Sequence, residues 1–310
     1  MAHGTTTSDA PMQARRPAAA SRDLSERSLG FLLLLPAALL LCFVVVYPVG
    51  RLIWTSFTNL RLTDNTSGAF IGVQNYFDVL ADPLFHGALA NTALYVAVTV
   101  PGAMIVGLGL ALLANMPFRR RWPVRLALLL PWALPLVFAG LIFRWFFESD
   151  YGLVNDIIVR LGGTKQQWLS TPSLAFVATC IAIIWKTSSF VALILLAGLQ
   201  TISRSLYEAA EVDGANAWQC FWRITLPLLM PSMIVAGIFR TITAIQTFEI
   251  PYAMTNGGPG DSTETLALYI HKNTLDFLDF GYGSALAVCM FLISMAVTAV
   301  YLRRIFGDKA

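Results

Sequence analysis

Residues 207–227 read YEAAEVDGANAWQCFWRITLP, a polar stretch that falls between two long apolar runs. Ser205 stands three residues before Glu208, which is the spacing of a capping box at the start of a helix. Gly214 favours a helix end, because glycine takes the left-handed C′ conformation at little cost. Pro227 suits the first turn of a following helix, where its missing N–H is not needed. The stretch therefore predicts a short helix, a sharp turn, a second short segment and then a membrane span.

The predicted short helix offers a flat surface, because Ala209 and Ala210 carry small side chains. Another protein could approach such a surface closely, and the flanking acids Glu208, Glu211 and Asp213 could pair with its basic groups. An ordinary amphipathic connector between two spans would have the same composition. The residues by themselves leave both interpretations open.

The composition is that of a polytopic membrane protein. Hydrophobic residues make up 56% of the 310 residues and charged residues 13%, with a mean hydropathy of +0.65, which is too apolar for a soluble domain. This length leaves room for about six spans of roughly 20 residues each. We expect an all-α fold with six transmembrane helices, and the apolar runs place them at about 30–54, 88–115, 123–147, 173–200, 228–253 and 283–306.

Residues 1–28 are polar and lack hydrophobic periodicity. We therefore expect them to form a disordered cytoplasmic tail. Residues 29–310 then form the six-helix transmembrane domain, with a cytoplasmic loop at 203–227. The first apolar run is too long for a signal peptide and lacks a small-x-small cleavage site after it. The four scattered cysteines are typical of small buried hydrophobes rather than of a disulfide framework.

Lysine and arginine set the expected orientation, because cytoplasmic segments are enriched in both. With the N-terminus inside, thirteen of them fall on inner segments: Arg15, Arg16, Arg22, Arg27, Arg119, Arg120, Arg121, Arg125, Arg204, Arg223, Arg303, Arg304 and Lys309. Four fall on outer loops: Arg61, Arg160, Lys165 and Lys272. This bias predicts that both termini and the 203–227 loop are cytoplasmic.

The sequence lacks the motifs of common enzymes. It contains no G-x-x-x-x-G-K-[ST] phosphate loop, its three histidines are isolated, and no H-E-x-x-H or Cys/His cluster suggests a metal. Glu249 is the only carboxylate well inside an apolar run, so an intramembrane enzyme would have no catalytic pair. We expect no catalytic residue, no metal and no cofactor bound by this chain. A receptor or scaffold would leave the acidic loop and the intramembrane polar residues unexplained.

Polar residues inside the runs indicate a solute path. Ionisable groups within spans usually face a protein interior or an aqueous cavity. Lys186 lies in the fourth run and Arg240 in the fifth, and Arg240, Thr243 and Thr247 share one helix face. Snorkelling, or pairing with Glu249 and backbone carbonyls, would explain the same residues. The path candidates are Trp132, Lys186, Thr187, Phe190, Arg240, Thr243 and Thr247; Trp132 could equally be a packing or interface aromatic.

The polar stretch resembles the EAA loop of ABC importer permeases, with Glu208-Ala209-Ala210, three residues, Gly214, nine residues, Ile224, one residue and Leu226-Pro227. The segments 255–259, TNGGP, and 281–285, GYGSA, resemble the last outer loop and last span of carbohydrate permeases. The closest resemblance is to the maltose-type subfamily, specifically to the first of its two permeases. It implies the type I importer permease fold.

In that family the EAA loop docks into a cleft on a cytoplasmic ATPase, which implies a coupling role for Glu208, Ala209, Ala210, Asp213, Gly214, Ile224, Leu226 and Pro227. The implied partners are a second permease in a heterodimer, two ATPase subunits that bind ATP and Mg, and an extracytoplasmic solute-binding protein. The implied location is a bacterial or archaeal inner membrane, among lipid and without nucleic acid.

The resemblance implies uptake of a sugar or related polyhydroxy solute by ATP-driven alternating access. The charges of Lys186 and Arg240 differ from the maltose permease pattern. They leave open another sugar, a polyol, or an anionic solute such as glycerol phosphate. A permease for an amino acid or peptide is a further alternative, against which the 255–285 segment argues. The solute could bind in this subunit or only pass through it.

Overall fold

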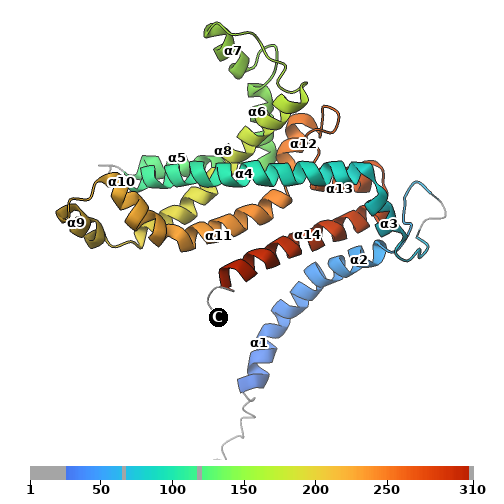
Figure 1. Cartoon of the computed structure of the whole chain (residues 1–310). Helices are drawn as coiled ribbons and strands as arrows, with labels where there is room; N and C mark the ends of the chain where they lie inside the picture. Colours follow the sequence, from blue (N-terminus) through green and yellow to red (C-terminus); the bar gives the residue numbers. More distant parts are fainter. Residues whose placement is uncertain (1–25, 65–67, 117–120, 307–310) are drawn as a thin grey trace, which may run out of the picture. The chain divides into compact units, whose positions relative to one another are not determined.

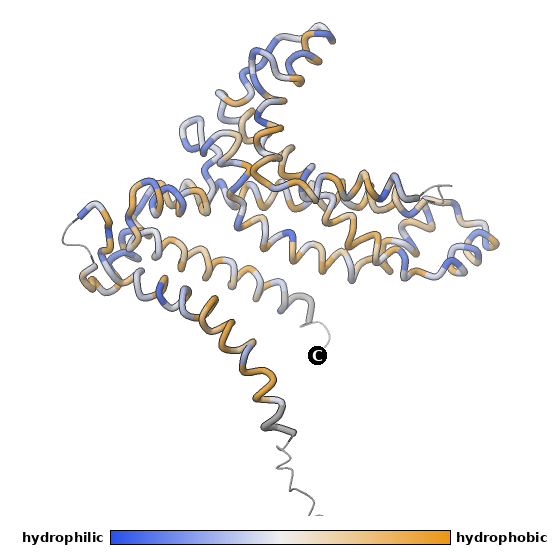
Figure 2. Tube along the Cα trace, turned by 180° about the vertical axis from the view of Figure 1, so that it is seen from behind, coloured by the Kyte–Doolittle hydropathy of each residue, from blue (hydrophilic) through white to orange (hydrophobic). Residues whose placement is uncertain are grey.

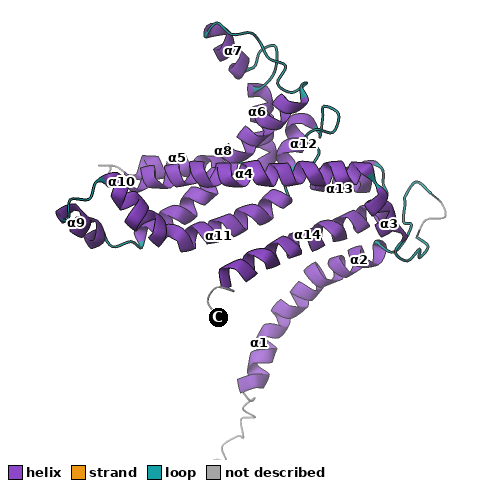
Figure 3. Ribbon diagram, viewed as in Figure 1, coloured by secondary structure: helices purple, strands orange, loops and turns teal. Residues whose placement is uncertain are grey.

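The computed structural model describes residues 26–64, 68–116 and 121–306, and within these ranges the regular structure is helical (Figure 3). Two isolated β-bridges, Thr58 with Phe70 and Arg61 with Asp279, are the exceptions. The chain divides into two units, residues 1–50 and 51–310.

The first unit is an exposed apolar helix. It contains α1 (Glu26–Leu41), the π turn η1 (Cys42–Val46) and the start of α2 (Tyr47–Thr55). The N–H of Tyr47 bonds to the carbonyl of Cys42, five residues back. Because α1 begins at Glu26, the tail boundary predicted at residue 28 falls inside a helix, while residues 1–25 lie outside the described ranges.

The second unit continues α2 and contains the remaining helices, which Figure 1 labels. Its elements are α3 (Gln74–Ala81), α4 (Pro83–Asn115), α5 (Arg121–Ala133), α6 (Leu136–Phe146), α7 (Leu153–Arg160), α8 (Pro172–Gln200), α9 (Arg204–Val212), α10 (Ala217–Cys220), η2 (Phe221–Thr225), α11 (Leu226–Ile245), α12 (Glu249–Thr255), α13 (Leu266–His271), η3 (Lys272–Asp276) and α14 (Phe280–Phe306).

Helices α4 and α8 form the centre of this unit and share its most extensive helix–helix contact. Small residues allow the close approach: a Cβ on Gly102 would lie 2.5 Å from Ile184 Cδ1, and one on Gly107 would lie 2.6 Å from Val191 Cγ1. Close packing over small residues is the usual way in which membrane helices associate, because lipid provides no hydrophobic force between them.

In the part of the chain that the structure describes, five helices are long and apolar enough to cross a membrane, and there are six if the pair α5 and α6, bent by 97°, is one span. This agrees with the six predicted helices. Figure 2 shows hydrophobic residues along the long helices and hydrophilic residues gathered in the connecting loops.

The fifth predicted span, 228–253, was wrong at both ends. The helix runs without interruption from Ala217 to Ile245, and α12 starts separately at Glu249. The break between them is stabilised from elsewhere in the chain, because the Thr265 hydroxyl donates to the carbonyl of Thr247 at 2.7 Å.

Candidate functional site: an exposed polar loop and a cavity between the helices

The polar loop begins with α9, whose start differs from the prediction. Ser203 is the N-cap and its side chain makes no capping bond, and Ser205 lies inside the helix, so the predicted capping box at Ser205 and Glu208 is wrong. The two serine hydroxyls instead bond to each other at 2.7 Å. Glu208 pairs with Arg204, one turn earlier, at 3.1 Å. A capping box does form one helix later, where Asn216 and Gln219 exchange two 2.9 Å hydrogen bonds.

The turn after α9 has the predicted form. Gly214 has φ +81°, in the left-handed region that favours glycine. The N–H of Ala215 bonds to the carbonyl of Ala210 at 2.9 Å, and the N–H of Gly214 bonds to that of Glu211 at 3.0 Å. These two bonds are a Schellman motif, which closes the end of a helix.

Pro227 lies in the first turn of α11, as expected, but no gap precedes that helix. The π turn η2 comes immediately before it, and the N–H of Leu226 bonds to the carbonyl of Phe221, five residues back. A proline clashes with the carbonyl four residues earlier, so a wider turn lets the helix continue. Pro48 follows η1 at the same spacing.

The loop is braced internally and exposed outwards. The hydroxyls of Tyr207 and Thr225 bond at 2.9 Å and tie α9 to η2. No residue of α9 is buried, and Val212 and Trp218 are 88% and 69% exposed. A hollow of about 350 Å³ is lined by Ala210, Asp213, Gly214, Ala215, Gln219, Cys220, Arg223 and Ile224. The Tyr207–Thr225 brace had no signal in the sequence, because it joins residues of two different helices.

A cavity of about 80 Å³ lies where α6, α8, α11 and α12 meet, lined by Leu136, Ile183, Thr187, Arg240, Thr243, Gln246, Thr247, Glu249 and Ile250. Four of the seven predicted path residues line it: Thr187, Arg240, Thr243 and Thr247. Trp132, Lys186 and Phe190 do not. The residues predicted to share one face of the fifth span therefore do line one cavity.

Arg240 is 2% exposed and does not snorkel. Its Nη2 donates to the Thr99 hydroxyl at 2.7 Å and its Nη1 to the Thr243 hydroxyl at 3.4 Å, while its Nε has no partner. Within the described ranges it forms no ion pair. The Glu249 pairing considered from the sequence is therefore not present in this structure.

Lys186 does not line this cavity. It is 6% exposed, and its Nζ donates to the carbonyl of Trp132 at 2.8 Å. That carbonyl is in the last turn of α5, where the helix ends at Ala133 and its carbonyls lose their backbone partners. A cation at this end also matches the helix dipole. Lys186 thus caps the C-terminal end of α5, at the break before α6.

Residues 103–306 match the family described as "Binding-protein-dependent transport system inner membrane component". The chain belongs to this family. Members of this family are parts of a transporter rather than enzymes. The family description names an inner membrane component, which agrees with the membrane protein expected from the composition.

Related transport components bear names from sugar and glycoside uptake. The chain is 63% identical to the sulfoquinovosyl glycerol transport system permease protein of Agrobacterium fabrum, over 91% of each chain. It is 38% identical to the trehalose/maltose transport system permease protein of Thermococcus litoralis, over 90% of this chain and 94% of the relative. These relatives confirm the resemblance to carbohydrate ABC permeases that the sequence motifs indicate.

A solved structure matches this transport component with a TM-score of 0.78 at 22% identity, covering 89% of this chain and 94% of the other. It is that of a bacterial ABC transporter involved in import of the acidic polysaccharide alginate. At this identity the match shows the fold alone, and it confirms the predicted type I importer permease fold.

In this transport component a second group of hydrogen-bonded polar residues surrounds Asp82, at the N-terminal end of α4. Asp82 is the N-cap of α4 and accepts from the N–H of Leu84 at 2.9 Å. It also accepts from the hydroxyls of Tyr269 and Tyr282, the latter at 2.6 Å. Burial would raise the pKa of Asp82, but the hydrogen bonds from the two tyrosines and the helix N–H groups outweigh it and lower the pKa. Burial, helped by the bond to Asp82, raises the pKa of Tyr269 to about 12.

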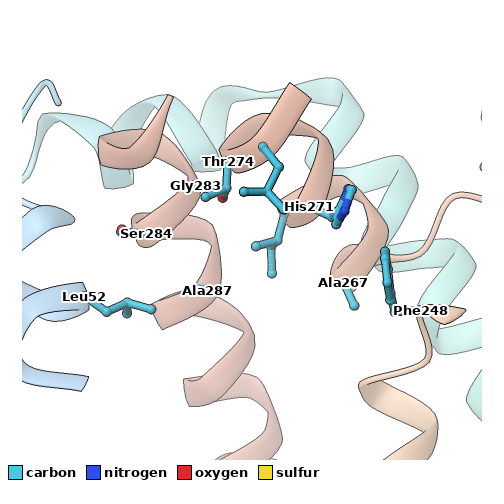
Figure 4. A pocket seen from close by; sticks show the side chains of 10 residues that line it. Leu52, Phe248, Ala267, His271, Thr274, Gly283, Ser284 and Ala287 are labelled. Carbon is cyan, nitrogen blue, oxygen red and sulfur yellow. The ribbon is translucent and has the colours of Figure 1, made fainter. Parts of the chain in front are cut away.

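An apolar hollow of about 380 Å³ lies beside this group, against α13, η3 and α14 (Figure 4). Leu52 and Phe248 face it from opposite sides, and His271 stands at its edge. None of the predicted path residues lines this hollow, so the path candidates and this space are separate features.

Proposed function

We propose that this chain is one of two permease subunits that form the path of an ABC importer for a sugar or glycoside. Sulfoquinovosyl glycerol, a sulfonated sugar joined to glycerol, is the first solute to test. What supports this solute class is the 63% identity to a permease named for it, over 91% of both chains. Relatives named for trehalose and maltose support the wider carbohydrate class.

The coupling role rests on one observation, the exposed unit formed by α9, the Schellman turn at Gly214 and α10. This unit projects its residues outwards and is fixed internally by Tyr207 and Thr225. We expect it to dock on a cytoplasmic ATPase, which would bind ATP and Mg. A second permease would complete the path, and an extracytoplasmic binding protein would deliver the solute.

A mechanical connection links this unit to the cavity. The helix from Ala217 to Ile245 has 29 residues, which at 1.5 Å per residue is about 40 Å long. One of its ends carries the coupling unit, and Arg240 and Thr243 near the other end line the cavity. A push on α10 during ATPase closure would therefore displace the cavity wall directly. Such rigid movement between two states is what alternating access requires.

The proposal is tested in vesicles that contain this chain, its companion permease, the ATPase and the loaded binding protein. ATP-dependent uptake of sulfoquinovosyl glycerol is expected. Glu208→Lys should abolish uptake and ATPase association, because it reverses a charge on the exposed docking face. The matched control is Asp156→Lys, which breaks the same kind of exposed pair, with Arg160 at 2.8 Å, on the predicted outer side. Equal uptake by both variants would contradict the docking role.

Gly214 provides a second test of the coupling unit. Gly214→Val should lower uptake, because a β-branched residue is strained at φ +81°. Gly214→Asn should retain most of it, since asparagine tolerates the left-handed region. Normal uptake by the valine variant would mean that the shape of this turn does not matter for coupling.

A further inference from the structure

Among the described residues, Arg240 is a buried cation that forms no ion pair. It is 2% exposed, its described partners are the hydroxyls of Thr99 and Thr243, and its Nε has none. A buried charge is costly unless an opposite charge compensates it. Two hydroxyls hold the guanidinium in place without neutralising it. A negative group in the cavity would compensate this charge.

The cavity beside Arg240 has the right size for such a group. Its volume of about 80 Å³ corresponds to two or three water molecules at roughly 30 Å³ each. A single sulfonate, carboxylate or phosphate group fits this space. Hydroxyls of Thr187 and Thr247 on the wall are suited to a polyhydroxy solute.

The other buried cation of the spans is not available for this purpose. Lys186 is engaged by the carbonyl of Trp132 at 2.8 Å and does not line the cavity. Of the two cations that the sequence singled out, only Arg240 lines the cavity. Its planar guanidinium can also offer two parallel N–H donors to an oxyanion, which a lysine ammonium cannot.

Glu249 is the competing candidate for the counter-charge, because it lines the same cavity. Among the described residues the two groups form no ion pair in this structure. An Arg240–Glu249 pair formed in another state would leave no unpaired cation for a solute. The two possibilities predict opposite effects of removing the carboxylate charge.

We propose that Arg240 recognises the oxyanion group of an anionic glycoside as the solute crosses this cavity, with Thr99 holding the guanidinium in position. The inference rests on the proposed import function and adds that the permease itself selects for charge. The bound group would accept from Nη1, displacing the long 3.4 Å contact to Thr243.

The test compares two solutes in the same vesicles, sulfoquinovosyl glycerol and its uncharged analogue glucosyl glycerol, each with saturating loaded binding protein. Arg240→Gln should lower the ratio of charged to uncharged uptake about tenfold or more, as expected for a lost charge-assisted hydrogen bond. The ratio for Arg240→Lys should lie between those of the wild type and Arg240→Gln, because lysine keeps the positive charge but lacks the two parallel N–H donors. Lys186→Met is the control and should leave the ratio unchanged.

Glu249→Gln distinguishes the two counter-charges. If the solute is the counter-charge, this variant keeps or raises the ratio, because a repelling carboxylate is gone. Loss of uptake of both solutes, with recovery in the Arg240→Gln/Glu249→Gln double variant, would overturn the proposal in favour of an internal ion pair.

Two further arms identify the source of the oxyanion. Glycerol phosphate and a carboxylated glycosyl glycerol show whether the preference extends beyond the sulfonate. Strong inhibition by free sulfate, with an unchanged ratio in Arg240→Gln, would mean that a resident inorganic ion fills the site and would overturn the inference. If wild-type vesicles take up neither glycoside, the proposed function itself fails. An unchanged ratio in active Arg240→Gln vesicles refutes only the role of Arg240.

Discussion

Gly107 sets the distance between α4 and α8, so Gly107→Ala should weaken the fold. An added Cβ would lie 2.6 Å from Val191 Cγ1, 2.8 Å from Val191 Cβ and 3.0 Å from the Ser188 carbonyl oxygen. Optimal separation between carbon atoms is about 3.5–4.0 Å. The helices would therefore have to move apart by about 1 Å along the most extensive contact of the domain.

The expected magnitude follows from two opposing terms. Overpacking a close contact costs about 1–3 kcal/mol, while replacing a helical glycine by alanine returns up to about 1 kcal/mol. Gly109 lies on the same helix and an added Cβ there meets nothing within 4 Å, so Gly109→Ala has the second term alone. The difference between the two variants isolates the clash at about 1–3 kcal/mol.

Thermal denaturation of the purified protein in detergent measures this difference. A loss of 1 kcal/mol lowers Tm by about 2–4 °C in proteins of somewhat smaller size, so Gly107→Ala should melt several degrees below Gly109→Ala. Equal melting temperatures would refute the argument, because they would mean that α4 and α8 are not held at the distance that Gly107 allows.

Three further outcomes are expected. Lys186→Met should destabilise the domain by about 1–3 kcal/mol in chemical unfolding, because the Trp132 carbonyl loses a charged donor. The pKa of Asp82 is lowered in the folded protein. Its stabilising effect is therefore complete above the ordinary aspartate pKa near 4 and is lost as the pH falls through the lowered pKa. The melting temperatures of wild type and Asp82→Asn should converge in acid. In a background without the native cysteines, an impermeant maleimide added to cells should label Leu161→Cys and not Val212→Cys.

Each of these has a control. Lys186→Arg keeps a charged donor and should lose less stability than the methionine variant; an equal loss would mean that packing, not the hydrogen bond, is responsible. A constant gap between wild type and Asp82→Asn down to strong acid would contradict the lowered pKa. The two labelling positions are 83% and 88% exposed, so the predicted topology alone distinguishes them, and the reverse pattern would invert the orientation.

The spans could be predicted because each apolar run is long enough to cross a membrane, and run length is a local property. The breaks inside them could not, because distant groups stabilise them. Lys186 supplies the donor at the end of α5, and Thr265 supplies the one that the Thr247 carbonyl needs. Hydropathy alone does not reveal a donor that comes from another helix.

The candidate site was predicted in part for the same reason. The periodicity of one helix placed Arg240, Thr243 and Thr247 on a shared face, and they do line one cavity. Lys186 and Trp132 were grouped with them as a polar and an aromatic residue within apolar runs. In the structure the Lys186 ammonium donates to the Trp132 carbonyl, and neither residue lines the cavity. In the polar loop, Gly214 was predictable from its own backbone requirement, whereas the capping-box spacing at Ser205 did not identify Ser203 as the N-cap.

The hydrogen bonds that converge on Asp82 connect α4, α13 and α14 through one carboxylate, and the ion pair of Arg61 with Asp279 adds the segment after α2. We expect elements joined in this way to move together as one block during a transport cycle. Two spectroscopic labels placed within this block should keep a constant separation whatever the nucleotide state. The block therefore supplies a fixed frame of reference inside the subunit, from which the displacement of α9 or α7 can be measured.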